Sequence, residues 1–460
     1  FAIASLATGR MGEGWLLEPR RWTLLAWGCL TVGILLGAWW SYEVLGWGGY
    51  WAWDPVENAS FLPWLTGTAY LHSVMVQERR GMLRVWNLSL LCATFALTIL
   101  GTFITRSGVL ESVHSFTESA IGPMLLAFFA VIVATAVGLI AWRGDDLRAE
   151  GSIDSPVSRT GAFLANNLLF GAFAFVVLLG TMFPLLVEAA NGDRISVGNP
   201  YFERMTMPIG FLLLFMMAVA PALPWGRAGT EVLAKRLQWP ASAGVAAMVV
   251  AVALGGRGWV TVLAVGLAGF ACGGAVRQLA LAVRSRGLLG FVGRSSGGMV
   301  VHVGVAIVAV AFAVSSSYVR QAEVRFTEPG DRAVVSGHEL VFDGLERVEL
   351  SEKDEVRVRV LVDGEAFTPA ITFFPFAGQT IGTPTTRSTW WDDLQLSVLA
   401  VPEQVGDDTI VRVTVQPLVW WIWYGGGVMA FGTLLAAVPG RRRRRDEESQ
   451  EAPVSEEVPG

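Results

Sequence analysis

Imidazole side chains are scarce in this sequence, which contains only His72, His114, His302 and His338. His72 and His302 fall within long apolar stretches. A single histidine in such a place is more often a satisfied polar side chain than a ligand. Two imidazoles on neighbouring helices can instead hold one metal between them, and haem iron accepts two axial imidazoles. The pair is therefore a candidate metal site.

The two intramembrane histidines lie at matching depths. His72 comes seven residues before Arg79, and His302 comes eight residues after Arg294. Both arginines mark a basic boundary of their apolar segments, and the two segments run in opposite directions. The sequence therefore predicts that the two imidazoles meet at one level inside the bilayer.

Three glycines lie close to His302 in the sequence, at Gly297, Gly298 and Gly304. Glycine lets a flat macrocycle approach a helix backbone closely. Glycine in a membrane helix is also ordinary packing, so both explanations stay open.

A second candidate site is the aromatic stretch WGGYWAWDPVENASFLPWL, residues 47–65. Its rings are Trp47, Tyr50, Trp51, Trp53, Phe61 and Trp64. Tryptophan and tyrosine gather at membrane interfaces in general, but such a belt needs few rings per helix end. The density here favours a stacking platform for a flat, apolar ligand.

Asp54 has the pattern of a helix start. Pro55 suits the first helical position, and Glu57 can complete a capping box. We therefore expect a helix to begin at Asp54, with the rings that precede it just outside the membrane surface. An N-cap role and a direct role in ligand binding both remain open for this carboxylate.

The elements that position these groups are predicted to be membrane helices. Hydrophobic residues make up 53% of the 460 residues and charged residues only 16%, which excludes an ordinary soluble domain. Runs of about 20 apolar residues can cross a bilayer. Ten such runs lie at about 22–45, 60–77, 82–105, 121–142, 160–188, 206–225, 238–254, 258–283, 297–318 and 417–438. We predict an all-α polytopic membrane protein with about ten transmembrane helices and a small extracytoplasmic β-domain before the last helix.

The charged segment before the last apolar run has strand periodicity. Residues alternate with period two in EVRVRVLV and TIVRVTVQ, and Asp-Gly turn signals occur at 343–344 and 363–364. The expected organisation is a transmembrane core over 1–318 with an outward tryptophan-rich loop at 46–58, a β-rich domain over 319–416, a final helix over 417–438 and a disordered cytoplasmic tail over 439–460.

Basic residues concentrate in alternate loops, for example at 79–80, 143–159 and 441–445. Basic short loops face the cytoplasm, so the aromatic stretch and the β-rich segment are expected on the outer side. The net charge of −5 gives no indication of nucleic acid binding.

The three cysteines, Cys29, Cys92 and Cys272, lie within apolar runs and lack CxxC spacing. We expect them to be small core hydrophobes rather than disulfide or metal ligands. The sequence begins at Phe1 without the pattern of a signal peptide, and we expect a further segment upstream of it.

The motifs also carry a family resemblance. WGGYWAWDPVENAS resembles the tryptophan-rich WWD signature of the haem-handling membrane proteins of cytochrome c biogenesis. DPVENASFLPWL and TRSGVLESVHSF (105–116), together with PTTRS (384–388) and WWIW (420–423), resemble the CcmF-type cytochrome c haem lyase subunit in particular. Tyr50 stands where relatives often have tryptophan.

The resemblance implies a haem lyase that attaches haem to CxxCH thiols of apocytochrome c. Its haem platform would be formed by Trp47, Tyr50, Trp51, Trp53 and Asp54. It also implies a permanent b-type haem between His72 and His302, which would pass electrons to the platform haem, with quinol as a candidate donor. The implied partners are a CcmE-type haem chaperone and CcmH/CcmI-type thiol-handling subunits, and the implied location is the bacterial inner membrane.

For the transient haem at the platform, the resemblance implies His114 as one axial ligand. The second axial ligand lies upstream of Phe1 or is His338, and the first of these is preferred. Arg106 at the outer membrane boundary could pair with a haem propionate or could be a snorkelling interface arginine.

Three alternative functions remain open from the sequence. A haem transporter or chaperone-loading protein of the same superfamily would share the platform. A haem lyase paralogue dedicated to nitrite reductase would share the whole motif set. A solute permease would bind no haem, and a buried haem could also be purely structural.

Overall fold

The computed structural model describes residues 1–9, 17–45, 49–108, 110, 121–148, 153, 155–227, 229–350, 353–375, 379–401 and 408–438. Its helices are α1 (Ala2–Thr8), α2 (Leu17–Val44), α3 (Pro55–Arg80), α4 (Arg84–Arg106), α5 (Gly122–Trp142), α6 (Arg159–Asn191), α7 (Asn199–Ala222), α8 (Thr230–Ala253), α9 (Trp259–Arg286), the 3-10 helix η2 (Gly287–Phe291), α10 (Arg294–Ser317) and α11 (Trp420–Ala437).

Each of the ten predicted apolar runs is a helix, from α2 to α11, which confirms the predicted fold class. Eight of the described helices are long and apolar enough to cross a membrane. α3 falls outside that group because polar side chains are spread along it, and α11 because tryptophans and glycines fill its first half. The sequence did not predict α1 or η2.

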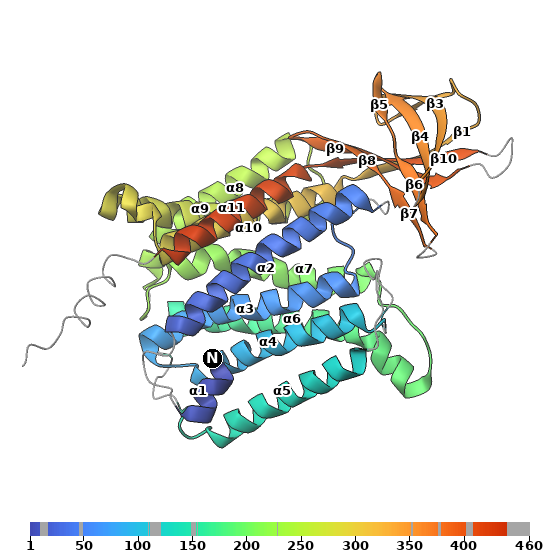
Figure 1. Cartoon of the computed structure of the whole chain (residues 1–460). Coiled ribbons are helices and arrows are strands. Elements are labelled where there is room, and N and C mark those ends of the chain that lie inside the picture. The colour runs from blue at the N-terminus through green and yellow to red at the C-terminus, as the bar shows by residue number, and fades with distance from the viewer. Residues whose placement is uncertain are drawn as a thin grey trace, which may run out of the picture.

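The helices form two packed groups that α2 and α7 connect. α3 packs on α4 and α6, whereas α10 packs on α9 and α11. α2 contacts both α3 and α11, and α7 contacts both α6 and α9. Figure 1 shows the helices running side by side, with the strands at one end of them. We call this end the strand end.

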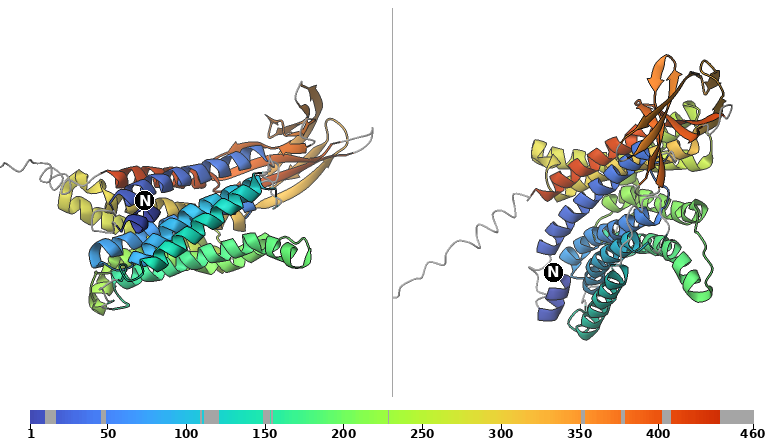
Figure 2. Two further views of the ribbon diagram at one scale, coloured as in Figure 1. Left: turned by 60° about the horizontal axis from the view of Figure 1, so that its bottom comes forward. Right: turned by 45° about the vertical axis from the view of Figure 1, so that its right-hand side comes forward.

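The strands lie between α10 and α11 in the sequence: β1 (Arg320–Phe326), β2 (Arg332–Val335), β3 (His338–Glu349), β4 (Asp354–Val362), β5 (Glu365–Phe367), β6 (Ala370–Phe374), β7 (Gln379–Thr383), β8 (Thr385–Ser388), β9 (Asp392–Ala400) and β10 (Thr409–Pro417). One sheet has the order β1-β10-β9-β8, and the other has the order β2-β3-β4-β6-β7 with β5 paired to β4. Figure 2 shows the sheets at the strand end in both views.

The predicted strands EVRVRVLV and TIVRVTVQ are β4 and β10. Of the two Asp-Gly turn signals, only one makes a turn. Asp363 and Gly364 join β4 to β5 with positive φ angles of 52° and 85°. Gly344 instead lies within β3, where the register shifts next to Phe342 and φ is 130°. The prediction of a turn at 343–344 was wrong because a bulge and a turn both favour glycine.

Glycines bring α10 and α11 into close contact. A Cβ atom on Gly297 would lie 2.3 Å from the backbone nitrogen of Ala436, and one on Gly304 would lie 2.6 Å from the carbonyl oxygen of Gly425. A Cβ atom on Gly298 would meet nothing within 4 Å. The two helix backbones therefore touch along the face that carries Gly297 and Gly304.

This packing predicts opposite effects for two adjacent substitutions. Gly297→Ala forces a methyl group into the backbone of α11 and is expected to lower the unfolding free energy by about 1–3 kcal/mol. Gly298→Ala adds the same methyl group in open space, and helix propensity favours alanine by up to about 1 kcal/mol. Thermal unfolding of the purified protein in detergent tests both, and equal destabilisation by the two variants would contradict the packing.

Candidate functional site

The two intramembrane histidines meet in the structure. The ring centroids of His72 on α3 and His302 on α10 are 6.1 Å apart, with an angle of 39° between the rings. Imidazole nitrogen binds a metal at about 2 Å, and the ring centre lies about 1 Å farther, so two imidazoles on one iron have centroids about 6 Å apart. The measured separation fits a shared metal.

Both rings have binding capacity that the protein does not use. The Nδ1 atoms of His72 and His302 are buried without a hydrogen-bond partner among the described residues. The backbone carbonyl of Thr68 lies near the His72 ring but outside hydrogen-bond geometry. A buried imidazole without partners is unfavourable, and a bound metal complex would remove this cost.

The walls beside His72 are apolar and aromatic. The ring of Phe170 on α6 stacks on His72 with centroids 6.0 Å apart and an angle of 13°, and the Phe163 ring lies at the same distance. The described residues contain no cluster of three or more His, Cys, Asp or Glu side chains that could hold a metal ion. The pair therefore suits a metal whose other ligands come from a macrocycle, as in haem.

The glycines near His302 differ in their surroundings. α11 occupies the space beside Gly297 and Gly304, so the prediction that these two glycines let a porphyrin approach α10 was wrong. Gly298 lies one helical turn before His302, on the same face of α10, and the space above it is open. Close approach of a flat group remains a prediction for Gly298.

An ion cluster joins the helices at the end opposite the strands. The carboxylate of Glu78, six residues after His72, accepts a hydrogen bond from Arg20 of α2. It also pairs with the guanidinium of Arg294 at the start of α10, at 2.9 Å. The side chains of Arg20 and Glu78 are 9% and 20% exposed. This is a direct link between the two helices that carry the histidines.

The helix start at Asp54 has the predicted geometry. The Val56 backbone N–H donates to Asp54 Oδ2 at 3.0 Å, and the Asp54 backbone N–H donates to Glu57 Oε2 at 3.3 Å. The Ala52 backbone N–H also donates to Glu57, at 2.8 Å. The capping box is therefore confirmed, and it fixes the last residues of the loop as well as the first turn of α3.

The described part of the tryptophan-rich loop before α3, residues 49–54, presents two half-buried indoles, Trp51 and Trp53. Trp53 has a positive φ of 55° and stacks on Phe202 of α7 at 5.2 Å and 6°. Trp51 meets Trp53 and Phe61 edge-on, at 5.8 Å and 5.7 Å. The carbonyl of Trp53 accepts a hydrogen bond from Asn58 at 2.9 Å, which holds the unusual backbone in place.

Tyr50 differs from the expectation of a stacking ring open to a ligand. Its ring is 8% exposed and stacks on Phe312 of α10 at 5.3 Å and 6°. Its hydroxyl shares a 2.5 Å hydrogen bond with the hydroxyl of Ser315. Burial raises the pKa of Tyr50 to about 12, against the opposing effect of that hydrogen bond. Tyr50 is thus a neutral anchor of the loop on α10.

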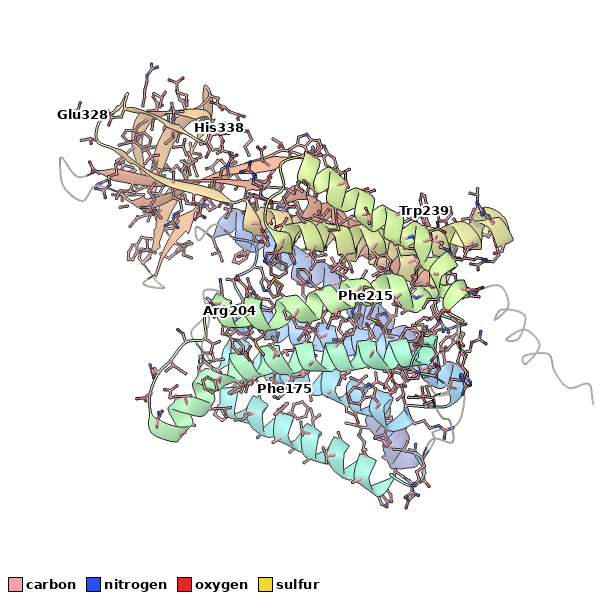
Figure 3. The ribbon with its side chains drawn as sticks, turned by 180° about the vertical axis from the view of Figure 1, so that it is seen from behind. Phe175, Arg204, Phe215, Trp239, Glu328 and His338 are labelled. Carbon is pink, nitrogen blue, oxygen red and sulfur yellow. The ribbon has the colours of Figure 1, made fainter. Side chains whose placement is uncertain are left out.

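Four further residues were predicted for the haem sites, and the structure describes two of them. Trp47 and His114 lie outside the described residues. Arg106 is the last residue of α4. His338 begins β3 and bonds to Asp363 at 2.6 Å, and Figure 3 shows it among the strands.

Comparison with known proteins gives the family. The sequence profile of the family described as Cytochrome C assembly protein matches residues 16–111. The cytochrome c-type biogenesis protein CcmF of Pseudomonas aeruginosa is 36% identical over 455 residues, which cover 96% of this chain and 68% of that protein. CcmF of Escherichia coli is 36% identical over 475 residues, with coverages of 98% and 70%. The chain belongs to the CcmF family.

A solved structure supports the same assignment. The structure named cytochrome c heme lyase CcmF matches with a TM-score of 0.79 and 36% identity, over 95% of this chain and 69% of that one. The probable cytochrome c-type biogenesis protein NrfE of Escherichia coli is 32% identical over 450 residues, which cover 96% of this chain and 68% of that protein. The protein is thus a multi-pass membrane protein of the CcmF haem lyase family.

Several residues that shape the site escaped the sequence analysis. Phe202, Phe312 and Ser315 support the loop from helices that are far away in the sequence. No local pattern marks such contacts. Arg294 was identified as a basic boundary in the sequence, but only the fold shows that it pairs with Glu78.

The capping box predicts the effect of changes at Asp54. Asp54→Ala removes the cap acceptor and is expected to cost about 1 kcal/mol of unfolding free energy. Asp54→Asn keeps an acceptor oxygen and is expected to stay near the wild type in both thermal unfolding and cytochrome c maturation. An Asn variant that folds normally but fails in maturation would show that the charge itself has a further role.

The ion cluster predicts that replacing Glu78 lowers the unfolding free energy more than replacing one residue of an exposed ion pair. Glu78→Gln removes the carboxylate that pairs with Arg20 and Arg294 and is expected to cost about 1–3 kcal/mol of unfolding free energy, less than for a fully buried pair. Glu188 pairs with Arg194 at 3.0 Å on the surface, and Glu188→Gln is expected to cost less than about 1 kcal/mol. Thermal unfolding of both variants measures the two losses of unfolding free energy. Equal losses would contradict a stabilising role of the Glu78 cluster.

Proposed function

We propose that this protein is a cytochrome c haem lyase that receives haem at the tryptophan-rich loop and attaches it to the CxxCH thiols of an apocytochrome. The observation that carries this proposal is the pairing of His72 with His302 beneath a loop of fixed indoles. The similarity to CcmF proteins and to a structure named as a haem lyase supports it.

His72 and His302 would hold a resident b-type haem through their ring nitrogens. The centroid separation, the unused Nδ1 atoms and the apolar walls fit this group. When bound, the group would supply one-electron chemistry. The role of the chain is to hold both imidazoles at one level, and the Glu78 cluster would maintain the separation of α3 from α10 that this requires.

At the loop, the chain would act by position rather than by a nucleophile. Trp51 and Trp53 would offer ring surface to the incoming haem, while Tyr50 and Asp54 hold the two ends of this segment on α10 and α3. The thioether bonds form when each thiol S–H adds across a haem vinyl group, which requires reduced iron but no protein nucleophile. Fixed geometry is the main contribution that such a site can make. Trp47 is proposed as a further platform ring, His114 as an axial ligand of the platform haem and Arg106 as the partner of a haem propionate.

A column of aromatic rings connects the loop with the histidine region. Trp53 meets Phe61 at 6.3 Å, and Phe61 meets Phe173 of α6 at 5.5 Å. Phe173 and Phe170 share a face of α6 because they are three residues apart, and Phe170 stacks on His72. This apolar column supports the proposal that the buried haem reduces the platform haem, with quinol as the proposed electron source.

The location and the partners follow from this function as proposals. The protein would lie in the bacterial inner membrane with the loop and the strands outside. The division into a core (1–318), a β-rich domain (319–416), a final helix (417–438) and a cytoplasmic tail (439–460) belongs to the same proposal. A CcmE-type chaperone would deliver haem, and CcmH/CcmI-type subunits would deliver the apocytochrome.

Two other functions can be separated by experiment. A haem exporter would move haem out of the cell without forming thioether bonds. A nitrite-reductase-dedicated lyase, suggested by the 32% identity to NrfE, would attach haem only to altered haem-binding motifs. Maturation of cytochromes with standard and altered CxxCH motifs, in cells that lack other lyases, discriminates between them.

Ligation by the histidine pair predicts a spectroscopic result. His72→Gly is expected to abolish the low-spin haem absorbance of the purified protein, because one axial imidazole is lost. Added free imidazole is expected to restore part of it by filling the space. His338→Ala, among the strands, is the matched control and should leave the spectrum unchanged.

The same variant tests the electron route. Loss of the buried haem should prevent reduction of the platform haem while leaving haem delivery to the loop intact. Full thioether formation without the buried haem would refute the electron route and leave a structural role for that haem.

A further inference from the structure

One sheet of the strand region buries a polar face as well as an apolar one. Leu394, Leu396 and Val413 face the core between the two sheets. The opposite face carries Asp393, Gln395 and Ser397 of β9 and Thr414 and Gln416 of β10, which are 1–7% exposed. Polar residues are seldom buried to this extent without partners, so this face must contact something that needs polar groups.

The end of α2 packs against this polar face. The Gln395 side-chain amide donates a hydrogen bond to the backbone carbonyl of Tyr42 at 2.9 Å, and a second one to the hydroxyl of Thr386 at 3.2 Å. Tyr42 is two residues from the end of α2. The last four carbonyls of a helix have no donor within the helix, so Gln395 caps α2 from a strand far away in the sequence.

Asp393 is the second group of this contact. Its carboxylate accepts a hydrogen bond from Ser388 at 3.0 Å. The Tyr42 hydroxyl lies beside this carboxylate without reaching hydrogen-bond geometry. Burial raises the pKa of Asp393 to about 6, with the Ser388 and Tyr42 hydroxyls opposing the shift. Burial of a charged carboxylate is unfavourable unless hydrogen-bond donors are held close to it.

The Tyr42 ring connects this contact to the tryptophan-rich loop. Its centroid lies 6.4 Å from Tyr50 of the loop and 6.4 Å from Trp423 of α11. Tyr42 is 1% exposed, so its ring has little freedom to move independently of these neighbours. The position of the helix end therefore affects how Tyr50 meets α10.

We infer that Gln395 and Asp393 are positioning residues for the tryptophan-rich loop, which they fix by capping the end of α2 and packing against Tyr42. Both side chains are buried and would not touch the haem. The link between the position of the loop and haem binding rests on the proposed function, whereas the positioning of the loop itself does not. The inference assigns a positioning role to β9, within the β-rich domain.

Hydrogen exchange of the purified protein, without added haem, tests the positioning directly. Gln395→Met removes the amide donor at similar length, and exchange of the backbone amides in residues 45–54 is expected to become about tenfold faster, as for loss of one buried hydrogen bond. Gln416→Met is the matched control, because Gln416 lies on the same face but its side chain, unlike that of Gln395, makes no hydrogen bond to α2 among the described residues. Its exchange should match the wild type.

Asp393 provides a second pair of variants in case Gln395→Met folds poorly. Asp393→Asn keeps the shape and an acceptor for Ser388 and should retain wild-type exchange in residues 45–54. Asp393→Leu removes the acceptor and should loosen this segment as Gln395→Met does. Unchanged exchange in both Gln395→Met and Asp393→Leu would overturn the inference.

A titration with haemin separates this inference from the proposed function. The apparent dissociation constant for haemin is expected to rise about tenfold in Gln395→Met, while the low-spin absorbance of the His72 and His302 site stays unchanged. Faster exchange with unchanged haemin affinity would uphold the positioning role and contradict the loop as a haem platform. A loss of the low-spin absorbance would show a general structural defect and overturn the specific role.

Discussion

The separation of α3 from α10 is the constraint on which the rest of the site depends. These helices belong to different packed groups, yet the rings of His72 and His302 come within 6.1 Å of each other. Direct helix packing would leave no room for a flat group between them. The Glu78 and Arg294 pair sets their distance at the end opposite the strands, and the tryptophan-rich loop connects them at the strand end.

Each of the two helices therefore carries a part of both candidate sites. α3 begins with the capping box of Asp54 and carries His72 farther along. α10 carries His302 and then Ser315, which bonds to Tyr50 of the loop. A change in the distance between these helices would alter the histidine pair and the loop together. Coupling between the sites then needs no separate moving element.

The helices, the Asp54 cap and the matching depth of His72 and His302 could be predicted from the sequence, because each follows from a local pattern. Apolar length predicts helices, and the order of Asp, Pro and Glu predicts a helix start. Matching depth followed from counting residues to basic boundaries. Each of these predictions uses the sequence of a single segment, or compares the distances of two residues from the ends of their segments.

The contacts between distant segments could not be predicted. Stacking of Trp53 on Phe202 and capping of α2 by Gln395 join segments that no pattern in one sequence connects. The burial of Tyr50 was missed for a related reason. An aromatic ring at an interface can face a ligand or a neighbouring helix with equal local chemistry, and only the position of Phe312 decides between them. Glycine was ambiguous in the same way, since Gly297 serves helix contact while Gly298 lies in open space.

The central claim is that one iron lies between the two intramembrane imidazoles. Electron paramagnetic resonance of the oxidised protein, purified with ¹⁵N-labelled histidine, tests it most directly through the hyperfine couplings of the axial nitrogens. The account predicts two strongly coupled histidine nitrogens in the wild type and the loss of this low-spin signal after replacement of either His72 or His302. A signal with one coupled histidine nitrogen in the wild type, or one that survives both replacements, would contradict it.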